Sequence, residues 1–245
     1  MEKTLAKGLK LLETIVQSDR PRGVSELARE LALTPSNVHR LLQTLKALGY
    51  LCHDQERGSY TASLRLFEMG MAASARIDAK AVAGPVMRDL AQRTGEKVQL
   101  STLDGGEIIY LEKVESRHPV GTVTRLGGRL PAHCSAAGKA MLAWSPQAAA
   151  ALRGVRLQSF TPHTIATPGA LAAELERIRV RGYATARGEW HLSVSSVAAA
   201  VRRADGQAVA AISVSGPAER FKSATIRAFA PLVMAAAKEI ADRLR

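Results

Sequence analysis

Apolar residues in the first fifty positions recur at the three- and four-residue steps that are typical of amphipathic helices. The first predicted helix buries a single stripe made of Leu5, Leu9, Leu12, Ile15 and Val16. A second helix begins at Ser25, its N-cap, or just before it. That helix buries Leu27, Ala28 and Leu31. After a tight turn over residues 32–34, Thr34 caps a third helix and Pro35 takes its first position.

The third helix, about residues 35–48, has an apolar face and a polar face. The predicted inward face contains Val38, Leu41, Leu42, Leu45 and Leu48. The outer surface carries hydrogen-bonding side chains and no acid, namely Ser36, Asn37, His39, Arg40, Gln43, Thr44 and Lys46. A carboxylate there would be repelled by phosphates, whereas Asn, Gln and Arg suit base edges in a major groove. This order of helices predicts a helix-turn-helix motif that binds DNA.

A predicted hairpin and a further helix follow. Gly49 is expected to end the third helix as its C′ residue. Residues 50–53 and 59–61 then flank a polar, glycine-containing tip, which is the pattern of the wing in a winged helix. Arg57 at the tip would reach a phosphate or the minor groove. The apolar spacing over residues 64–77 predicts a linker helix.

The remaining sequence alternates between strand and helix patterns. Two predicted hairpins turn at Asp104-Gly105-Gly106 and at Asp205-Gly206. Their strands cover residues 97–103, 107–114, 194–203 and 208–215. Helices are expected at about 79–94, despite Pro85 within it, and at 135–144, 146–153, 170–181 and 223–244. The predicted fold class is α+β, with a DNA-binding domain over 1–62, a linker helix over 63–78 and an antiparallel α/β domain over 79–245.

Length, composition and charge narrow this picture. The 245 residues suit two domains, and with 47% hydrophobic but only 4% aromatic residues the cores are built from Ala, Val and Leu. The net charge is +12, yet residues 1–78 carry 11 Lys and Arg against 9 Asp and Glu. The positive excess therefore lies mainly outside the predicted DNA-binding domain. Particular side chains, and not net charge, support the DNA-binding prediction.

The sequence lacks the features that are typical of several other classes of protein. No apolar run is long enough to span a membrane and no secretion signal is evident, which predicts a cytoplasmic protein associated with the nucleoid. Cys52 and Cys134 are isolated, so no metal site or other cofactor is expected. The segment Ala136-Ala137-Gly138-Lys139 lacks two required P-loop positions, because His133 and Ala140 occupy them. No catalytic motif is found, and no enzymatic residue is predicted.

Three features of the second domain suggest a ligand site. The small side chains around Ala136 and Ala137 leave the backbone accessible at a helix start. Ser213 and Ser215 share one face of a strand, and Ser196 opposes them if the Asp205-Gly206 turn sets the register. Positive charge nearby, from Arg129, His133 and Arg187, favours an anionic ligand such as an aromatic or hydroxy-carboxylate. Alternatively, these arginines are ordinary solvated surface.

The chain resembles one known family along nearly its whole length. The segment VSELARELALTPSNVHRLLQTLKALGYL and the wing end RGSYTASLRLFEMG are similar to the DNA-binding half of the isocitrate lyase regulator (IclR) family. The blocks GGRLPAHCSAAGKAMLA, RGYATARGEW and AVAAISVSGPAERF resemble later markers of that family, in family order. The resemblance implies a winged-helix domain, a linker helix and a GAF-like effector domain. It also implies dimers, or dimers of dimers, on palindromic operators.

The resemblance adds to both predicted sites. It places effector contacts at Ala136, Ala137, Ser196, Ser213 and Ser215. The full predicted effector site also includes Leu130, His133, Ala186 and Arg187. Ala186 stands where relatives that sense small α-keto acids have an acid, which argues against that ligand class, and Ala32 replaces a glycine before the turn. The full predicted DNA-binding set is Ser25, Ser36, Asn37, His39, Arg40, Gln43, Thr44 and Arg57.

The predicted function is therefore sequence-specific DNA binding that a small organic, carboxylate or aromatic effector modulates. Two alternatives stay open at this point. In one, the chain is a ligand-binding module or enzyme whose N-terminal helices only dimerise, which would bury Asn37 and Arg40. In the other, a winged-helix protein binds nucleic acid without any ligand, which the small-residue segment and paired serines disfavour. In a regulator, the ligand must favour one arrangement of the two DNA-reading heads, and the linker helix would transmit it.

Overall fold

The computed structural model describes residues 2–119, 121–122, 124–152 and 154–244. By its internal contacts the chain divides into an N-terminal unit, residues 1–76, and a C-terminal unit, residues 77–245. None of the helices in these described segments combines the length and the hydropathy that crossing a membrane requires. The two units are described separately below.

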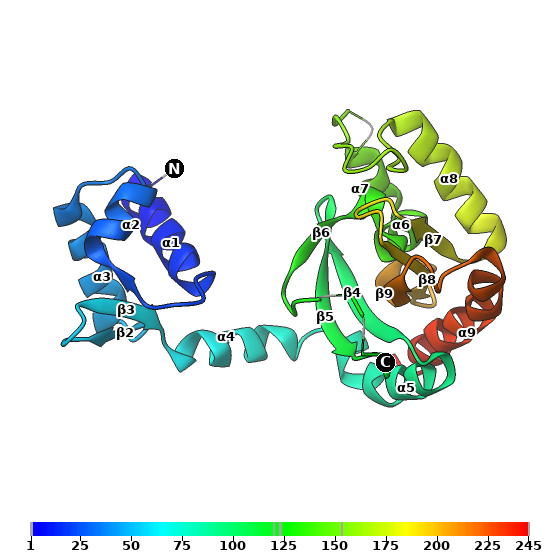
Figure 1. Ribbon diagram of the computed structural model, residues 1–245, viewed down its shortest axis with the longest axis horizontal. Helices are drawn as coiled ribbons and strands as arrows, with labels where there is room; N and C mark the ends of the chain where they lie inside the picture. Colours follow the sequence, from blue (N-terminus) through cyan, green and yellow to red (C-terminus); the bar gives the residue numbers. More distant parts are fainter. Residues whose placement is uncertain (1, 120, 123, 153, 245) are drawn as a thin grey trace. The chain divides into compact units, whose positions relative to one another are not determined.

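The N-terminal unit is a winged helix-turn-helix, as predicted (Figure 1). Its strands form an antiparallel sheet in the order β1-β3-β2, of which β1 was not expected from the sequence. The hairpin of β2 and β3 is the predicted wing, and α4 is the predicted linker helix. In chain order the elements are α1 (Lys3–Val16), β1 (Arg22–Gly23), α2 (Val24–Glu30), α3 (Pro35–Ala47), β2 (Leu51–Asp54), β3 (Ser59–Ala62) and α4 (Leu64–Ser74).

The core of this unit corrects the predicted stripe on the first helix. Leu11 and Ile15 are buried, whereas Leu5, Leu9 and Val16 are exposed. The sequence places leucines at four positions of α1, which makes two overlapping apolar stripes, and only the one through Leu11 packs on the core. The other stripe remains on the surface. The prediction was therefore right for Leu12 and Ile15, which pack on the core, and wrong for Leu5, Leu9 and Val16.

The helices of this unit end close to the predicted residues, but the predicted roles of two residues at helix ends need correction. The Thr34 hydroxyl accepts a hydrogen bond from the Asn37 amide at 3.4 Å, and Pro35 begins α3, as expected. The second helix begins at Val24 after Gly23, which is just before Ser25, as one of the two predicted starts had it, and Ser25 is not the N-cap. Leu48, predicted to face inward, is exposed because it is the C-cap residue, beyond the last turn that packs on the core.

Ala32, in the turn between α2 and α3, has a positive φ of 52°. A left-handed backbone costs a residue with a Cβ roughly 1 kcal/mol, which is why glycine is preferred there. The amide of Leu33 nevertheless donates to the Ala28 carbonyl at 2.9 Å, which closes the end of α2. The turn thus forms with alanine in place of glycine.

The C-terminal unit is built on one antiparallel sheet of six strands in the order β6-β5-β4-β9-β8-β7. The predicted hairpins are present, and β6 and β7 add strands at the two edges that the sequence pattern did not reveal. The strands are β4 (Lys97–Asp104), β5 (Glu107–Val114), β6 (Arg129–Pro131), β7 (Ala184–Arg187), β8 (Val194–Arg202) and β9 (Ala208–Pro217). The described helices are α5 (Asp78–Thr94), η1 (Ala132–Cys134), α6 (Ala136–Leu142), α7 (Pro146–Ala151), α8 (Pro168–Arg181) and α9 (Ser223–Asp242).

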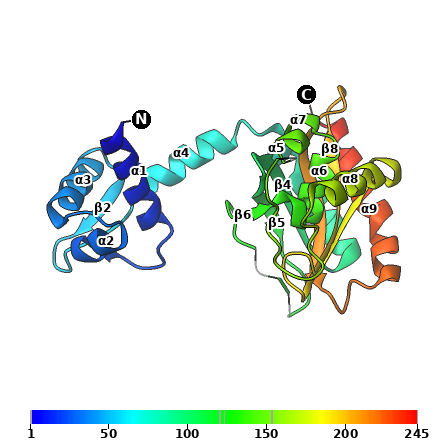
Figure 2. The ribbon, with the colours of Figure 1, turned by 90° about the horizontal axis from the view of Figure 1, so that it is seen from above.

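Helices cover both faces of this sheet (Figures 1 and 2). On one face, α5 and α9 bury an apolar cluster that includes Val98, Leu100 and Ile212. On the other face, α6 and α8 bury a second cluster with Ala198 and Ala211. The expected helices are all present within a few residues of their predicted limits, and α5 continues through Pro85. The face covered by α6 also contains the cavity described below.

Candidate DNA-binding surface and ligand cavity

The outer face of α3 is open to solvent. Ser36, His39, Arg40 and Thr44 are exposed, and Asn37 is half-buried. The guanidinium of Arg40 donates a hydrogen bond to Asn37 Oδ1 at 3.4 Å, so these two side chains lie together on the surface. No acid occurs anywhere in α3. The chain's own interior therefore does not cover the face that the sequence analysis assigns to DNA.

Gln43 plays a different part from its neighbours on α3. Its Nε2 donates to the hydroxyl of Tyr60 at 3.1 Å and lies 3.4 Å from His39 Nε2. Tyr60 is fully buried and its ring stacks on His53 with centroids 4.3 Å apart. These contacts join α3 to both strands of the wing. Gln43 is thus positioned to hold the wing against the helix rather than to extend freely from it.

The wing tip is shaped by Asp54. Its Oδ1 accepts hydrogen bonds from the backbone amides of Glu56 and Arg57 at 3.0 and 3.1 Å. The Arg57 side chain is exposed, with its Nε 3.8 Å from the Asp54 carboxylate. Such a weak surface pair leaves the guanidinium available to another anion. Ser25 is exposed on α2 of the same unit.

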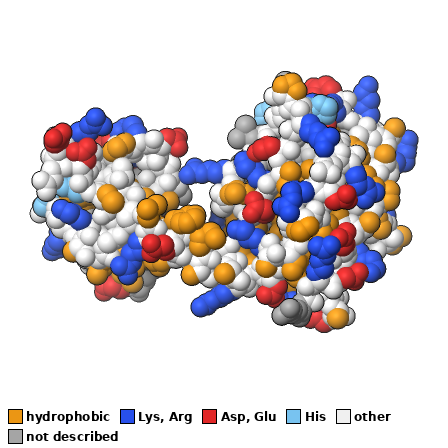
Figure 3. Space-filling view, turned by 90° about the horizontal axis from the view of Figure 1, so that it is seen from below, with side chains coloured by type: hydrophobic (Ala, Val, Ile, Leu, Met, Phe, Trp, Pro, Cys, Tyr) orange, Lys and Arg blue, Asp and Glu red, His pale blue; other side chains and the backbone are white. Residues whose placement is uncertain are grey.

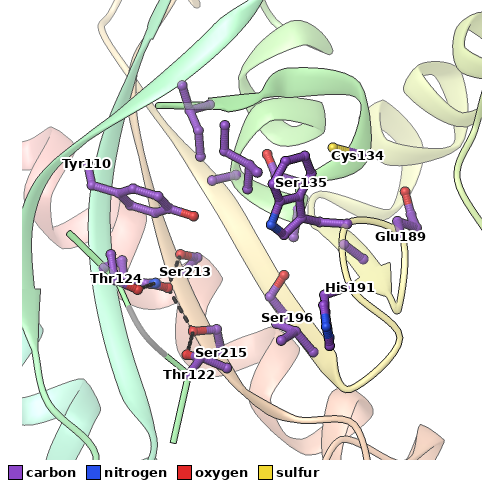
Figure 4. A pocket seen from close by; sticks show the side chains of 18 of the residues that line it. Tyr110, Thr122, Thr124, Cys134, Ser135, Glu189, His191, Ser196, Ser213 and Ser215 are labelled. Atoms are coloured by element: carbon purple, nitrogen blue, oxygen red, sulfur yellow. Dashed lines mark hydrogen bonds between the residues drawn. The ribbon is translucent and has the colours of Figure 1, made fainter. Parts of the chain in front are cut away.

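The C-terminal unit contains a cavity of about 750 Å³ between the sheet and the start of α6 (Figure 4). This volume lies in the range of small-molecule sites. One part of its lining is apolar, formed by Ile108, Leu130, Ala136, Ala137, Ala186 and Val194. Another part is polar, formed by Gln99, Thr122, Thr124, Ser213 and Ser215. The cavity can therefore hold a mainly apolar molecule that carries a hydrogen-bonding group.

Side-chain hydrogen bonds join several residues of the polar part of the lining to one another. The Ser213 and Ser215 hydroxyls donate to Gln99 Oε1 at 3.3 and 2.9 Å, and Gln99 Nε2 donates to Thr124 Oγ1 at 2.7 Å. The register of the sheet explains the cluster, since Gln99 on β4 pairs with Ser213 on β9. Tyr110 also lines the cavity, and burial raises the pKa of its phenol to about 12. The phenol is therefore protonated at neutral pH.

A buried ion pair fixes another wall of the cavity. The Lys139 ammonium on α6 lies 2.6 Å from both carboxylate oxygens of Glu189, which lines the cavity. The Thr161 hydroxyl donates to the Gly188 carbonyl and the Thr164 hydroxyl to the Glu189 carbonyl, each at 2.6 Å. Burial raises the pKa of Glu189 and lowers that of Lys139, because removal from water disfavours both charged forms. Their mutual attraction opposes this cost.

This wall also explains the sequence AAGK that resembles part of a P-loop. A Cβ on Gly138 would lie 2.3 Å from the carbonyl oxygen of Ala132, so the close approach of η1 and α6 requires glycine. The Lys139 ammonium forms an ion pair with the Glu189 carboxylate. Cys134 beside them is buried, and burial raises its thiol pKa to about 12. Gly138 and Lys139 therefore serve packing and the ion pair, and the Cys134 thiol stays protonated at neutral pH.

The structure brings most predicted effector residues to one place. Those on the cavity lining are Leu130, Ala136, Ala137, Ala186, Ser196, Ser213 and Ser215, and Ser196 pairs with Ser215 as the predicted register requires. His133 and Arg187 are not on the lining. The His133 ring contacts the Gln158 carbonyl at 2.9 Å, and Arg187 donates to the Ser223 hydroxyl at 3.2 Å. The geometry gives no support to effector contacts by these two side chains.

The expected positive charge around the cavity is partly present, since Arg125 and Arg129 both lie on its lining. Arg129 lies on the lining but is exposed and paired with Asp104 and Glu107, at 2.6 and 3.4 Å. Sequence reasoning missed several lining residues, including Gln99, Tyr110, Thr124, Cys134, Glu189 and Trp190. A glutamine in a predicted buried strand could have indicated the first of them. The other residues reach the cavity only when the chain folds, so their sequence positions do not indicate it.

A winged helix-turn-helix unit followed by a unit with a small-molecule cavity defines a class of protein, the ligand-responsive transcription regulator. Comparison with known families agrees. The family model "IclR helix-turn-helix domain" matches residues 4–55, and "Bacterial transcriptional regulator IclR C-terminal" matches residues 71–242. The chain belongs to the IclR family of bacterial transcriptional regulators, with a DNA-binding domain and a ligand-binding domain.

Individual relatives extend over almost the entire chain. The transcriptional repressor IclR of Escherichia coli (strain K12) is 33% identical over 241 residues, which covers 97% of this chain and 88% of the relative. The regulator KdgR of the same strain is 31% identical over 92% of this chain and 87% of its own length. A crystal structure of IclR from Thermotoga maritima superposes with a TM-score of 0.83 at 31% identity, covering 100% of this chain and 99% of that one.

One solved structure also contains a small molecule. It is an IclR homolog from Microbacterium hydrocarbonoxydans in complex with 4-hydroxybenzoate. It matches with a TM-score of 0.85 at 28% identity and covers 99% of each chain. A protein of this fold can therefore bind an aromatic hydroxy acid.

Proposed function

We propose that the outer face of α3 enters the major groove of an operator, with Ser36, Asn37 and Arg40 near base edges. The observation that carries the proposal is the exposed Arg40–Asn37 pair on a helix surface without acids. Arg and Asn side chains are suited to guanine and adenine edges. The remaining predicted positions would contact the DNA backbone or support the helix, namely Ser25, His39, Gln43, Thr44 and Arg57.

The cavity of the C-terminal unit is the proposed effector site. Its apolar walls, Tyr110 and Trp190 suit an aromatic ring, and its polar part suits a substituent that forms hydrogen bonds. The related protein in complex with 4-hydroxybenzoate supports a small aromatic or hydroxylated organic acid as the ligand class. Binding must favour one arrangement of the DNA-reading units, because a ligand with equal affinity for all arrangements shifts none of them.

We also propose that the protein acts as a dimer on palindromic DNA in the cytoplasm. On α1, Leu5 and Leu9 are exposed, and α4 has no buried residue although Leu64 and Phe67 expose 79% and 66% of their surface. Figure 3 shows hydrophobic side chains gathered over α4. A helix of this length is marginal in water unless its apolar face is covered. A second copy of the chain would supply that cover, and two α3 helices would then read two half-sites.

Selection of genomic DNA fragments on the purified protein tests this function. We expect one recurring palindromic sequence, bound with a dissociation constant of about 10⁻⁸ M or tighter at physiological salt. Titration of that fragment with aromatic and hydroxylated organic acids should then change the affinity by about 5- to 150-fold for at least one compound. Equal binding of all fragments would refute sequence-specific recognition, and binding that no acid alters would refute the effector class.

The dimer is tested separately by sedimentation of the full-length protein. Leu5→Glu together with Leu9→Glu places charge on the exposed stripe of α1 without touching the buried one. We expect the wild-type protein to sediment as a dimer or tetramer. The variant should dissociate into monomers at higher protein concentrations than the wild type does. A monomeric wild-type protein that still binds the palindrome would contradict the proposal.

A further inference from the structure

The C-terminal unit has a second hollow, at the point where the edge strand β7 begins (Figure 1). The first residue of β7, Ala184, pairs with Ala198 of β8. The next four residues of β8, residues 199–202, pair with β9 alone. The backbone groups of this stretch that point away from β9 therefore have no strand partner, as at any open sheet edge.

The hollow beside this edge has a volume of about 380 Å³, which lies in the range of small-molecule sites. Met234, Ala237 and Ala241 of α9 line it, and so does Trp144, which follows α6. Ala237 belongs to the apolar cluster under α9, whereas Trp144 packs on the cluster under α6. The hollow thus spans the edge of the sheet. It shares no described lining residue with the effector cavity, so the two can be occupied independently.

Arg202, at the end of β8, presents an unused cation to this hollow. Its guanidinium carbon lies 4.0 Å from the centroid of the Trp144 ring. Stacking on an aromatic ring orients the guanidinium plane. The side chain makes no hydrogen bond or ion pair with any described residue, so its five N–H donors remain available. A guanidinium edge binds a carboxylate through two parallel hydrogen bonds.

The other charges on the lining are already paired. Arg203 lies 3.3 Å from the carboxylate of Asp78, and Lys238 lies 2.5 Å from that of Asp242. Both pairs are exposed to solvent. Among the described residues of the lining, Arg202 is then the cation without a carboxylate partner. The hollow as a whole therefore favours an anion.

We propose that this hollow binds a small organic carboxylate, with the carboxylate on Arg202 and the body of the molecule along the open edge of β8. The alanines of β8 and α9 leave room for a small apolar body. An amide group on that body would pair with the strand edge, as an added strand does. The inference goes beyond the proposed function, because it assigns a second ligand to a site outside the effector cavity.

The two tryptophans of the chain report on the two sites separately. Trp144 lines this hollow and Trp190 lines the effector cavity. The full-length Trp190→Phe variant keeps Trp144 as its sole tryptophan, and Trp144→Phe keeps Trp190. Each is titrated at constant ionic strength with N-acetyl-leucine, with its uncharged counterpart N-acetylleucinamide, and with 4-methylpentanoate, which is the same acid without the acetylamino group.

We expect N-acetyl-leucine to change the Trp144 fluorescence saturably in the millimolar range or below. N-acetylleucinamide should bind at least tenfold more weakly, because it lacks the charge that Arg202 recognises. 4-Methylpentanoate should bind at an intermediate affinity, because it keeps the carboxylate and loses the contact with the strand edge. Equal affinities of the two acids would overturn the role of the edge.

An arginine variant shows whether Arg202 causes the preference. In the Trp190→Phe background, Arg202→Gln should reduce the preference for the acid over its amide below threefold. Arg227→Gln removes the same charge from an exposed position of α9 and should leave the preference unchanged. Equal losses in the two variants would show that net charge attracts the acid, and would overturn the site.

The remaining outcomes distinguish this inference from the proposed function. A response of Trp190 without a response of Trp144 would place the acid in the effector cavity and overturn the second site. No saturable response of Trp144 to either acid would also overturn it. In both cases the operator selection and the effector titration described above keep their own results, since neither depends on Arg202.

Discussion

The two units place their functional side chains in opposite environments. In the N-terminal unit the groups assigned to DNA, such as Arg40, lie on the outside of a helix whose other side is core. In the C-terminal unit the groups assigned to a ligand, such as Ser213 and Gln99, lie inside, among buried strands. A change at the first site should alter binding without altering stability. A change at the second site should alter both.

The largest effect is expected where the cavity wall depends on a buried charge pair. Lys139→Met leaves the Glu189 carboxylate buried without its partner at 2.6 Å. We expect a loss of about 3–5 kcal/mol in the free energy of unfolding, measured by denaturant titration. Adding Glu189→Leu should recover most of it, because two apolar side chains replace the pair.

The matched control for this prediction is Lys238→Met on α9. Lys238 is exposed and pairs with Asp242 at 2.5 Å, and surface pairs of this kind contribute less than about 1 kcal/mol. A loss at Lys139 as small as the loss at Lys238 would mean that the buried pair does not support the wall. Substitutions in the cavity wall would then not cost more free energy of unfolding than substitutions on the exposed surface.

On the outer surface, Arg40→Ala should change binding alone. If Arg40 makes a bidentate base contact, operator affinity falls by about 1–3 kcal/mol, which is roughly 5- to 150-fold. The free energy of unfolding should stay within about 0.5 kcal/mol of wild type, because the side chain is exposed. Fluorescence anisotropy with the selected operator measures the first quantity and denaturant titration the second.

Arg227→Ala, which removes an exposed arginine from α9, is the charge-matched control for Arg40→Ala. It should leave operator affinity unchanged at the same salt concentration. Equal losses in the two variants would show that total charge, and not the face of α3, determines binding.

A smaller effect tests the turn that sets α3 against α2. Ala32→Gly relieves a left-handed backbone, and we expect the N-terminal unit to gain about 0.5–1 kcal/mol in stability. Ala47→Gly, in the last turn of α3, is the matched control and should lose up to about 1 kcal/mol. Thermal unfolding of the full-length protein measures both shifts. Destabilisation by Ala32→Gly would show that this backbone is not strained.

The smallest test compares one thiol from each unit. Cys52 is exposed on the wing, whereas Cys134 is buried with a thiol pKa of about 12. At pH 8 iodoacetamide should alkylate Cys52 and leave Cys134 nearly unreacted, because the thiolate is the reactive form. Mass spectrometry of the native protein should show one added group, and Cys52→Ser should remove it. Rapid double alkylation would mean that the cavity opens widely.

The same contrast explains what the sequence could predict. The helix-turn-helix followed from helical periodicity and from local features such as Thr34-Pro35, and its surface residues stood out against the leucines of the opposite face. On α1, leucines at adjacent positions produced two possible stripes, and only packing chose between them. Patterning thus identifies an exposed site well when one face is clearly apolar.

The cavity was less accessible to such reasoning. The serine pair and the small residues at the start of α6 were identified from alternation and from the family resemblance, and the paired register of Ser196 and Ser215 followed from the hairpin turn. Gln99 and Glu189 could not be assigned, because their roles depend on partners 50 or more residues away along the chain. His133 and Arg187 show the opposite error, in which nearness in sequence did not mean facing the cavity.

The account depends most on how the face of α3 that carries Arg40 meets DNA. Dimethyl sulfate footprinting of the selected operator reports this directly, because the reagent methylates guanine N7 in the major groove. We expect protection of guanines in two half-sites about one helical turn apart, and its loss with Arg40→Ala. Unprotected guanines in a fully bound operator, or protection that Arg40→Ala leaves unchanged, would contradict major-groove recognition by α3.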